Sequence, residues 1–113
     1  MKKICLILFL GLLTFKNNVY ASDIILESLK EGKKIIFLRH ALAPGNGDPE
    51  NFNINDCTTQ RNLSESGIIQ SKNIGLFFEK NKIKIDKILS SEWCRCKDTA
   101  KIAFNNFETF NAL

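Results

Sequence analysis

Histidine is scarce in this sequence: the 113 residues contain a single one, His40. A zinc site at Cys94 and Cys96 is a weak alternative, because these cysteines lack the usual paired spacing and an added histidine. The longest apolar run, residues 4–15, is too short to span a bilayer comfortably. We see no internal repeat and no low-complexity segment. These absences argue against a histidine-rich metal protein, a multispanning membrane protein and a repeat protein.

The first 21 residues have the three parts of a secretory signal peptide. Lys2 and Lys3 form a positive start, residues 4–15 are apolar, and residues 19–21 place small side chains where a signal peptidase reads them. The alternative is an N-terminal membrane anchor. We expect cleavage after Ala21, a periplasmic or secreted protein, and contact with the membrane only through the signal peptide.

The basic character of the chain comes mainly from this N-terminal region. The formal net charge is +4, and removing Lys2, Lys3 and Lys16 leaves about +1. A nearly neutral remainder gives no reason to expect a nucleic acid as a partner.

Three cysteines remain after the expected cleavage: Cys57, Cys94 and Cys96. Export would permit a disulfide, and the odd number leaves at least one cysteine outside it. A bridge from Cys57 to either Cys94 or Cys96 would close a loop of almost forty residues. The chain-entropy model gives about 4 kcal/mol for such a loop, as an upper value.

Hydrophobic patterning predicts alternating strands and helices after a short N-terminal helix over residues 22–30. Residues 34–38 form a continuous apolar run, typical of a strand buried on both faces. Ser64 is a suitable cap for a helix reaching about Lys80. A second strand over 87–90 and a helix from Cys94 to about Asn106 complete a strand-helix-strand-helix order. This order is typical of an α/β fold with a parallel sheet.

Three residues are predicted to meet at one edge of that sheet. Arg39 and His40 follow the first strand, and Arg95 follows the second at the start of a helix. Ligands of open parallel sheets bind beyond the carboxyl ends of the strands. Guanidinium groups bind phosphate through paired hydrogen bonds, and an imidazole can accept a phosphoryl group covalently. The residues therefore predict a phosphate site with His40 as nucleophile.

The sequence resembles the histidine phosphatase superfamily, the phosphoglycerate-mutase-like proteins. Three segments carry the resemblance, in the order and at about the spacing of that family: Leu38-Arg39-His40-Ala41; Arg61-Asn62-Leu63-Ser64-Glu65-Ser66-Gly67-Ile68-Ile69-Gln70; and Ser90-Ser91-Glu92-Trp93-Cys94-Arg95-Cys96-Lys97-Asp98-Thr99-Ala100. The resemblance covers residues 34–103.

The resemblance implies a phosphomonoesterase in which His40 is phosphorylated during turnover and Arg39 and Arg95 bind the phosphoryl group. The ligand would be a phosphorylated small molecule or phosphate, with no metal and no organic cofactor. The implied fold is a three-layer α/β/α sandwich, and residues 22–113 would be its N-terminal part in an exported protein.

The sequence also departs from the family pattern. Ala41 stands where the family usually has glycine, and the second catalytic histidine of the family has no counterpart in this chain. The family's general acid usually lies beyond the Arg95 segment, and we assign none. Two alternatives therefore stay open: a non-catalytic phosphate-binding or interaction module, and a small disulfide-linked protein in which the Arg-His pair is incidental.

Overall fold

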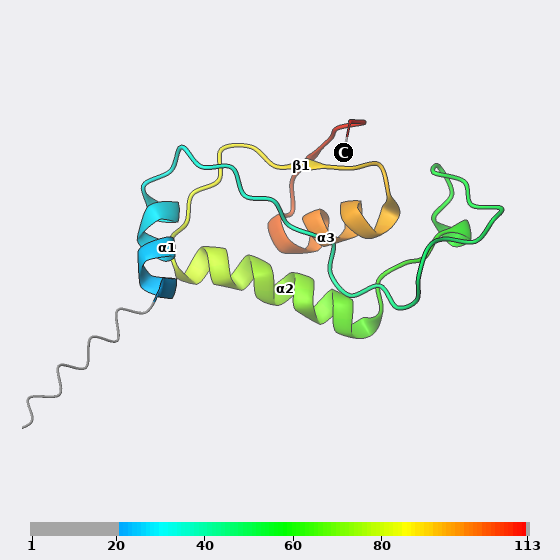
Figure 1. The fold of residues 1–113 in the computed structure, drawn as a ribbon, viewed down its shortest axis with the longest axis horizontal. Coiled ribbons are helices and arrows are strands. Elements are labelled where there is room, and N and C mark those ends of the chain that lie inside the picture. Colours follow the sequence, from blue (N-terminus) through cyan, green and yellow to red (C-terminus); the bar gives the residue numbers. More distant parts are fainter. Residues whose placement is uncertain (1–20, 113) are drawn as a thin grey trace, which may run out of the picture.

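The computed structural model describes residues 21–112 as three α-helices, a short 3-10 helix and two short strands (Figure 1). The predicted signal peptide, apart from Ala21, lies outside the described residues. The elements follow one another as α1 Ala21–Lys30, η1 Cys57–Thr59, α2 Glu65–Lys80, β1 Leu89–Ser90, α3 Cys94–Phe104 and β2 Glu108–Thr109.

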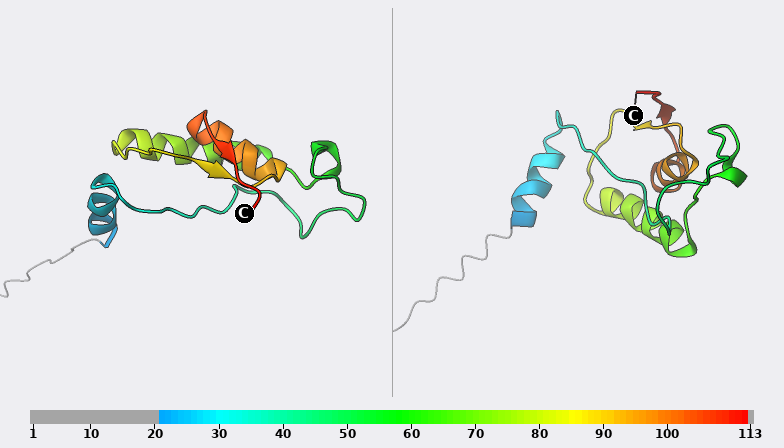
Figure 2. Two further views of the ribbon diagram at one scale, coloured as in Figure 1. Left: turned by 90° about the horizontal axis from the view of Figure 1, so that it is seen from above. Right: turned by 45° about the vertical axis from the view of Figure 1, so that its right-hand side comes forward.

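The two strands form a small parallel sheet. Leu89 pairs with Glu108 and Ser90 with Thr109, and α3 is the connection between the strands. The predicted strand at 87–90 is thus present as its last two residues, whereas β2 had not been predicted. A parallel strand pair joined by a helix is compatible with the predicted α/β class. Figure 2 shows α3 between this sheet and α2, so the described residues form part of a layered arrangement.

The prediction of a strand over residues 34–38 is wrong for this structure. The segment has no regular secondary structure and runs from α1 toward α3 (Figure 1). Ile35 and Phe37 are each 83% exposed. A strand requires a neighbour for its backbone hydrogen bonds, and no segment within residues 21–112 pairs with this one. The apolar side chains of residues 34–38 favour burial, and nothing within residues 21–112 buries them.

Helix α2 begins and ends where local signals predict. The Ser64 hydroxyl accepts a hydrogen bond from the backbone N–H of Gly67 at 3.1 Å, which satisfies one of the free donors of the first turn. Glu65 in the first turn and Lys80 in the last complement the helix dipole. The predicted start at Ser64 is therefore confirmed.

Helix α3 packs directly against α2 through small residues and aromatic rings. A Cβ on Gly75 would overlap the backbone carbonyl of Ala103, so the helices approach closely at this point. The rings of Phe78 and Phe104 meet edge-to-face with centroids 5.2 Å apart. Asn105, in the left-handed conformation with φ 62°, ends α3 one residue before the predicted boundary.

Gly67 is the point where α2 touches the segment that follows His40. A Cβ on Gly67 would overlap the carbonyl group of Leu42. We expect Gly67→Ala to lower the free energy of unfolding by about 1–3 kcal/mol, the usual cost of overpacking. Denaturant unfolding measures this change. Ser66→Ala, at an exposed position of the same turn, is the matched control. Equal unfolding midpoints for the two variants would contradict the close contact.

Candidate active site

The backbone of Ala41 and Leu42 joins the three segments that carry the family resemblance. The Ala41 N–H donates to Thr99 Oγ1 at 3.0 Å, and the Leu42 N–H donates to Gln70 Oε1 at 2.9 Å. The Leu42 carbonyl accepts from the backbone N–H of Ser64 at 3.0 Å. Residue 41 is only 2% exposed. The segment after His40 is therefore held by both α2 and α3.

His40 is partly buried, and one of its ring nitrogens is already engaged. Nδ1 lies 2.8 Å from the carbonyl oxygen of Ala41. A carbonyl oxygen only accepts hydrogen bonds, so this contact assigns the hydrogen of the neutral ring to Nδ1. Nε2 then carries the lone pair, which is the arrangement that a nucleophilic imidazole requires.

Arg95, the second residue of α3, is held in a mostly buried ion pair. Its Nη1 lies 3.0 Å and 3.1 Å from the two carboxylate oxygens of Asp48, and the two side chains are 11% and 9% exposed. The guanidinium lies over the Trp93 ring, 4.6 Å from its centroid. Arg95 and His40 are linked through Thr99, because the Thr99 hydroxyl donates to the Arg95 carbonyl at 2.7 Å and accepts from Ala41.

Asp48 is held in its ionised form by its surroundings. The backbone N–H of Arg61 donates to Asp48 Oδ1 at 2.8 Å. This hydrogen bond, followed by the positive charge of Arg95, lowers the pKa of the Asp48 carboxyl below its ordinary value of 3.8 against the opposing effect of burial. A carboxyl group with a lowered pKa is a poor proton donor at neutral pH.

Arg61 organises the loop that carries Asp48. Its Nε donates to the Gly47 carbonyl at 2.7 Å, and its Nη1 donates to the Ala43 carbonyl. Gly45 and Gly47 have φ angles of 90° and 67°, which glycine adopts without strain. In the sequence, Arg61 stands out only as the first residue of a segment that resembles the family, and Asp48 belongs to none of the three segments. No periodicity or spacing could have paired the two.

Arg39 differs from Arg95 in its environment. It is exposed, and within residues 21–112 its side chain makes no hydrogen bond and no ion pair. The structure therefore places one predicted phosphate-binding arginine in a fixed position and leaves the other on the surface next to His40.

The structure joins Cys57 to Cys94 in a disulfide with Cα atoms 5.6 Å apart, and Cys96 is a partly buried thiol. The Cys94 N–H donates to the buried side-chain oxygen of Gln60 at 2.9 Å, which adds a second link between the loop and α3. Because Cys94 is in the disulfide, it cannot serve as a thiolate ligand of the alternative metal site. Among residues 21–112, no three His, Cys, Asp or Glu side chains are grouped to hold a metal ion.

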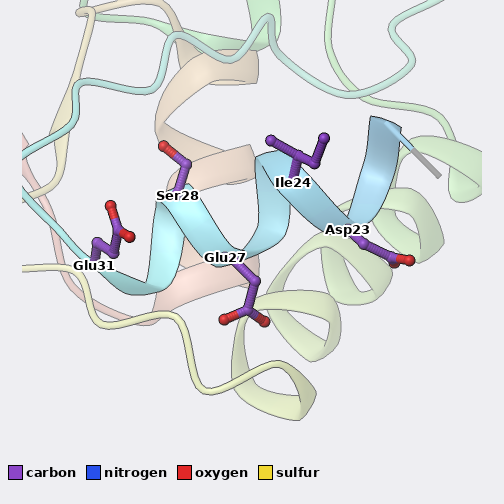
Figure 3. A pocket seen from close by; sticks show the side chains of 5 residues that line it. All are labelled: Asp23, Ile24, Glu27, Ser28 and Glu31. Carbon is purple, nitrogen blue, oxygen red and sulfur yellow. The ribbon is translucent and has the colours of Figure 1, made fainter. Parts of the chain in front are cut away.

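Neither of two surface hollows contains the candidate residues. One, of about 500 Å³, is lined by four residues of α1 and by the residue that follows this helix: Asp23, Ile24, Glu27, Ser28 and Glu31 (Figure 3). The other, of about 280 Å³, is lined by residues 85–88 together with Phe104 and residues 106–108. The first is one open face of a helix, and both lack His40 and Arg95. The candidate site is therefore defined by its hydrogen-bonded residues and not by a cavity.

The chain is similar to the serine/threonine-protein phosphatase Pgam5, mitochondrial, of Drosophila virilis. The two are 28% identical over 93 residues, which are 82% of this chain and 29% of Pgam5. The chain thus spans less than a third of the length of this relative. No protein-family model matches the chain. No solved structure matches it. This similarity to a phosphoglycerate-mutase-family protein points toward the histidine phosphatase superfamily.

No helix among residues 21–112 has both the length and the apolar character that a bilayer crossing requires.

The disulfide should contribute strongly to stability because it closes a loop across 37 residues of sequence separation. We expect Cys57→Ser to lower the free energy of unfolding by up to about 4 kcal/mol. Cys96→Ser, which removes the free thiol, is the matched control and should change it by less than about 1 kcal/mol. Denaturant unfolding with and without a dithiol reductant measures both. A Cys57→Ser variant with the unfolding midpoint of the oxidised parent would contradict this expectation.

The ion pair should make stability depend on pH in the acid range. A carboxyl group whose pKa is lower in the folded than in the unfolded state stabilises the fold above its ordinary value, here 3.8, and loses this contribution as pH falls through the folded value. We expect Asp48→Asn to lose less stability than the parent chain over this acid range. Thermal unfolding of both at a series of pH values measures the difference, and parallel curves would show that Asp48 contributes none of it.

Proposed function

We propose that this chain carries the phosphoryl-accepting part of a phosphomonoesterase, in which His40 is the nucleophile and Arg39 and Arg95 bind the phosphoryl group. The observation that carries the proposal is the hydrogen bond of His40 Nδ1 to the Ala41 carbonyl, which leaves Nε2 free. The bond from Ala41 to Thr99 supports it further, because it ties the residue after His40 to α3 one helical turn beyond Arg95.

The proposed reaction divides hydrolysis of a phosphate monoester into two steps. Nε2 of His40 forms a bond to phosphorus while the bond to the ester oxygen breaks, and the departing oxygen takes up a proton. Water then attacks phosphorus, releases inorganic phosphate and restores the imidazole. Positive charge on Arg39 and Arg95 stabilises the negative phosphoryl oxygens in both steps. Asp48, whose pKa is lowered, is not the donor of that proton.

The proposal includes the fold and the location that the resemblance implies. In the three-layer sandwich that the resemblance implies, further parts of the fold would cover residues 34–38. The exposure of Ile35 and Phe37 supports this, because large apolar side chains are normally covered. A periplasmic or secreted location would agree with the disulfide, since disulfides persist in oxidising compartments.

A non-catalytic phosphate-binding module is the second candidate. The observation that favours it is the single histidine of the 113 residues, because the family resemblance implies a second one in the transfer step. Such a module would bind phosphate through Arg39 and Arg95 without forming a covalent intermediate.

Trapping of the intermediate tests the proposed reaction. The full oxidised chain, incubated with p-nitrophenyl phosphate and quenched in base, should give a phosphorus NMR signal of phosphohistidine that disappears in acid. His40→Asn should abolish the signal, whereas Lys72→Ala, at an exposed position of α2, should retain it. Signal that persists in His40→Asn would overturn the proposal. Phosphate binding with no signal in the parent chain would establish the binding module instead.

A further inference from the structure

Asp48 contacts only one nitrogen of the Arg95 guanidinium. Both carboxylate oxygens lie near Nη1, and the Arg61 carbonyl also accepts from Nη1 at 3.4 Å. Nη2 makes no hydrogen bond within residues 21–112, and Nε is buried without a partner. The Asp48 contact therefore leaves one whole edge of the guanidinium without an acceptor.

That free edge has the geometry of an anion-binding fork. The N–H bonds of Nε and Nη2 are parallel on the side of the guanidinium away from Nη1, and they match two oxygens of a phosphate. A buried donor without a partner is rare in proteins and calls for an explanation, such as a group that binds there. Trp93 covers a face of the guanidinium and so leaves its edges for hydrogen bonding.

We propose that Asp48 is a positioning residue of the phosphate site: it anchors Nη1 of Arg95 so that the Nε–Nη2 edge binds a phosphoryl group. This inference rests on the proposed function, and it adds the edge that binds and the residue that orients it. Asp48 is itself fixed by the backbone N–H of Arg61, so the orientation of Arg95 derives from the loop that Arg61 organises.

Asp48 assists phosphate binding by fixing the position of the Arg95 guanidinium and not through its own charge. A negative carboxylate beside a phosphate site weakens anion binding, so its presence needs a compensating benefit. The benefit is that the guanidinium is already oriented before the anion arrives, which reduces the entropy lost on binding. An uncharged acceptor of the same shape should therefore serve as well as the carboxylate, whereas a longer carboxylate should not.

Two substitutions separate these effects. Asp48→Asn keeps an acceptor oxygen at nearly the same position and removes the charge, whereas Asp48→Glu keeps the charge and moves it by one methylene group. With inorganic phosphate as the probe, Asp48→Asn should bind within about threefold of the parent chain, and Asp48→Glu about tenfold more weakly. The reverse order, or equal binding by all three, would overturn the proposal.

The NMR signal of the Arg95 Nε–H group reports the binding edge directly. In the full oxidised chain this signal should shift on addition of phosphate, and it is assigned by its loss in Arg95→Lys. If Asp48→Glu fails to fold, as judged by its amide spectrum, this signal in the parent chain and in Asp48→Asn decides the question. An Arg95 signal that stays unchanged while phosphate binds would overturn the proposal.

The His40→Asn variant keeps this test independent of catalysis. The Arg95 signal should still shift when phosphate is added to this variant, because His40 makes no contact with the Asp48–Arg95 pair. An intact shift in a parent chain that forms no phosphohistidine would remove the proposed reaction and leave Asp48 as the positioning residue. Phosphohistidine formation in a parent chain whose Arg95 signal stays unchanged would keep the proposed reaction and remove Asp48 as the positioning residue.

Discussion

The site depends on how the backbone of Ala41 and Leu42 satisfies its hydrogen bonds. No strand within residues 21–112 pairs with the segment before Ala41. The backbone N–H and C=O groups of Ala41 and Leu42 must therefore find other partners. They find Thr99 on α3, Gln70 on α2 and the backbone of Ser64 at the start of α2. These hydrogen bonds hold the segment after His40 against two helices, although the sheet within residues 21–112 has only two short strands.

These contacts give several residues of the recognised segments a physical role. Gly67 is small because the Leu42 carbonyl lies where its Cβ would be, and Ser64 both caps α2 and bonds to Leu42 through its backbone. Thr99 bonds to Ala41 and to the carbonyl of Arg95. The same side chains that build the two helices thus position the segment that follows His40, and a change at any of them would affect stability and site together.

Features set by neighbouring residues were predictable from the sequence, and features set by distant contacts were not. The start of α2 follows from the Ser64 cap and the hydrophobic pattern after it, which are local. The strand over residues 34–38 depends on partners elsewhere in the chain, and hydrophobicity alone could not supply them. The sequence limited the disulfide partner of Cys57 to Cys94 or Cys96 and could not choose between them. The choice of Cys94 depends on helical geometry and on the path of the loop in the folded chain.

The loop between Ala43 and Gln60 shows the same limit at the site itself. Its turn residues were evident in the sequence, but its path is set by Arg61, by the disulfide and by the Gln60 contact with α3. The ring of Phe52, in this loop, also packs 5.0 Å from that of Trp93, the residue that supports Arg95. The Asp48–Arg95 pair therefore results from four separate contacts, and apart from the disulfide, which the sequence narrowed to two pairings, none is visible as a pattern.

The charges at the site are divided between a fixed pair and a free group. Arg95 has a fixed orientation, and its positive charge is offset by the Asp48 carboxylate. Arg39 is exposed, and no carboxylate within the described residues forms an ion pair with it. Fixed donors supply geometric selectivity for a tetrahedral anion, and an exposed cation mainly supplies long-range attraction. Since His40 lines neither surface hollow, these residues would, under the proposed function, select for the phosphoryl group itself and contribute little to recognition of the rest of a substrate.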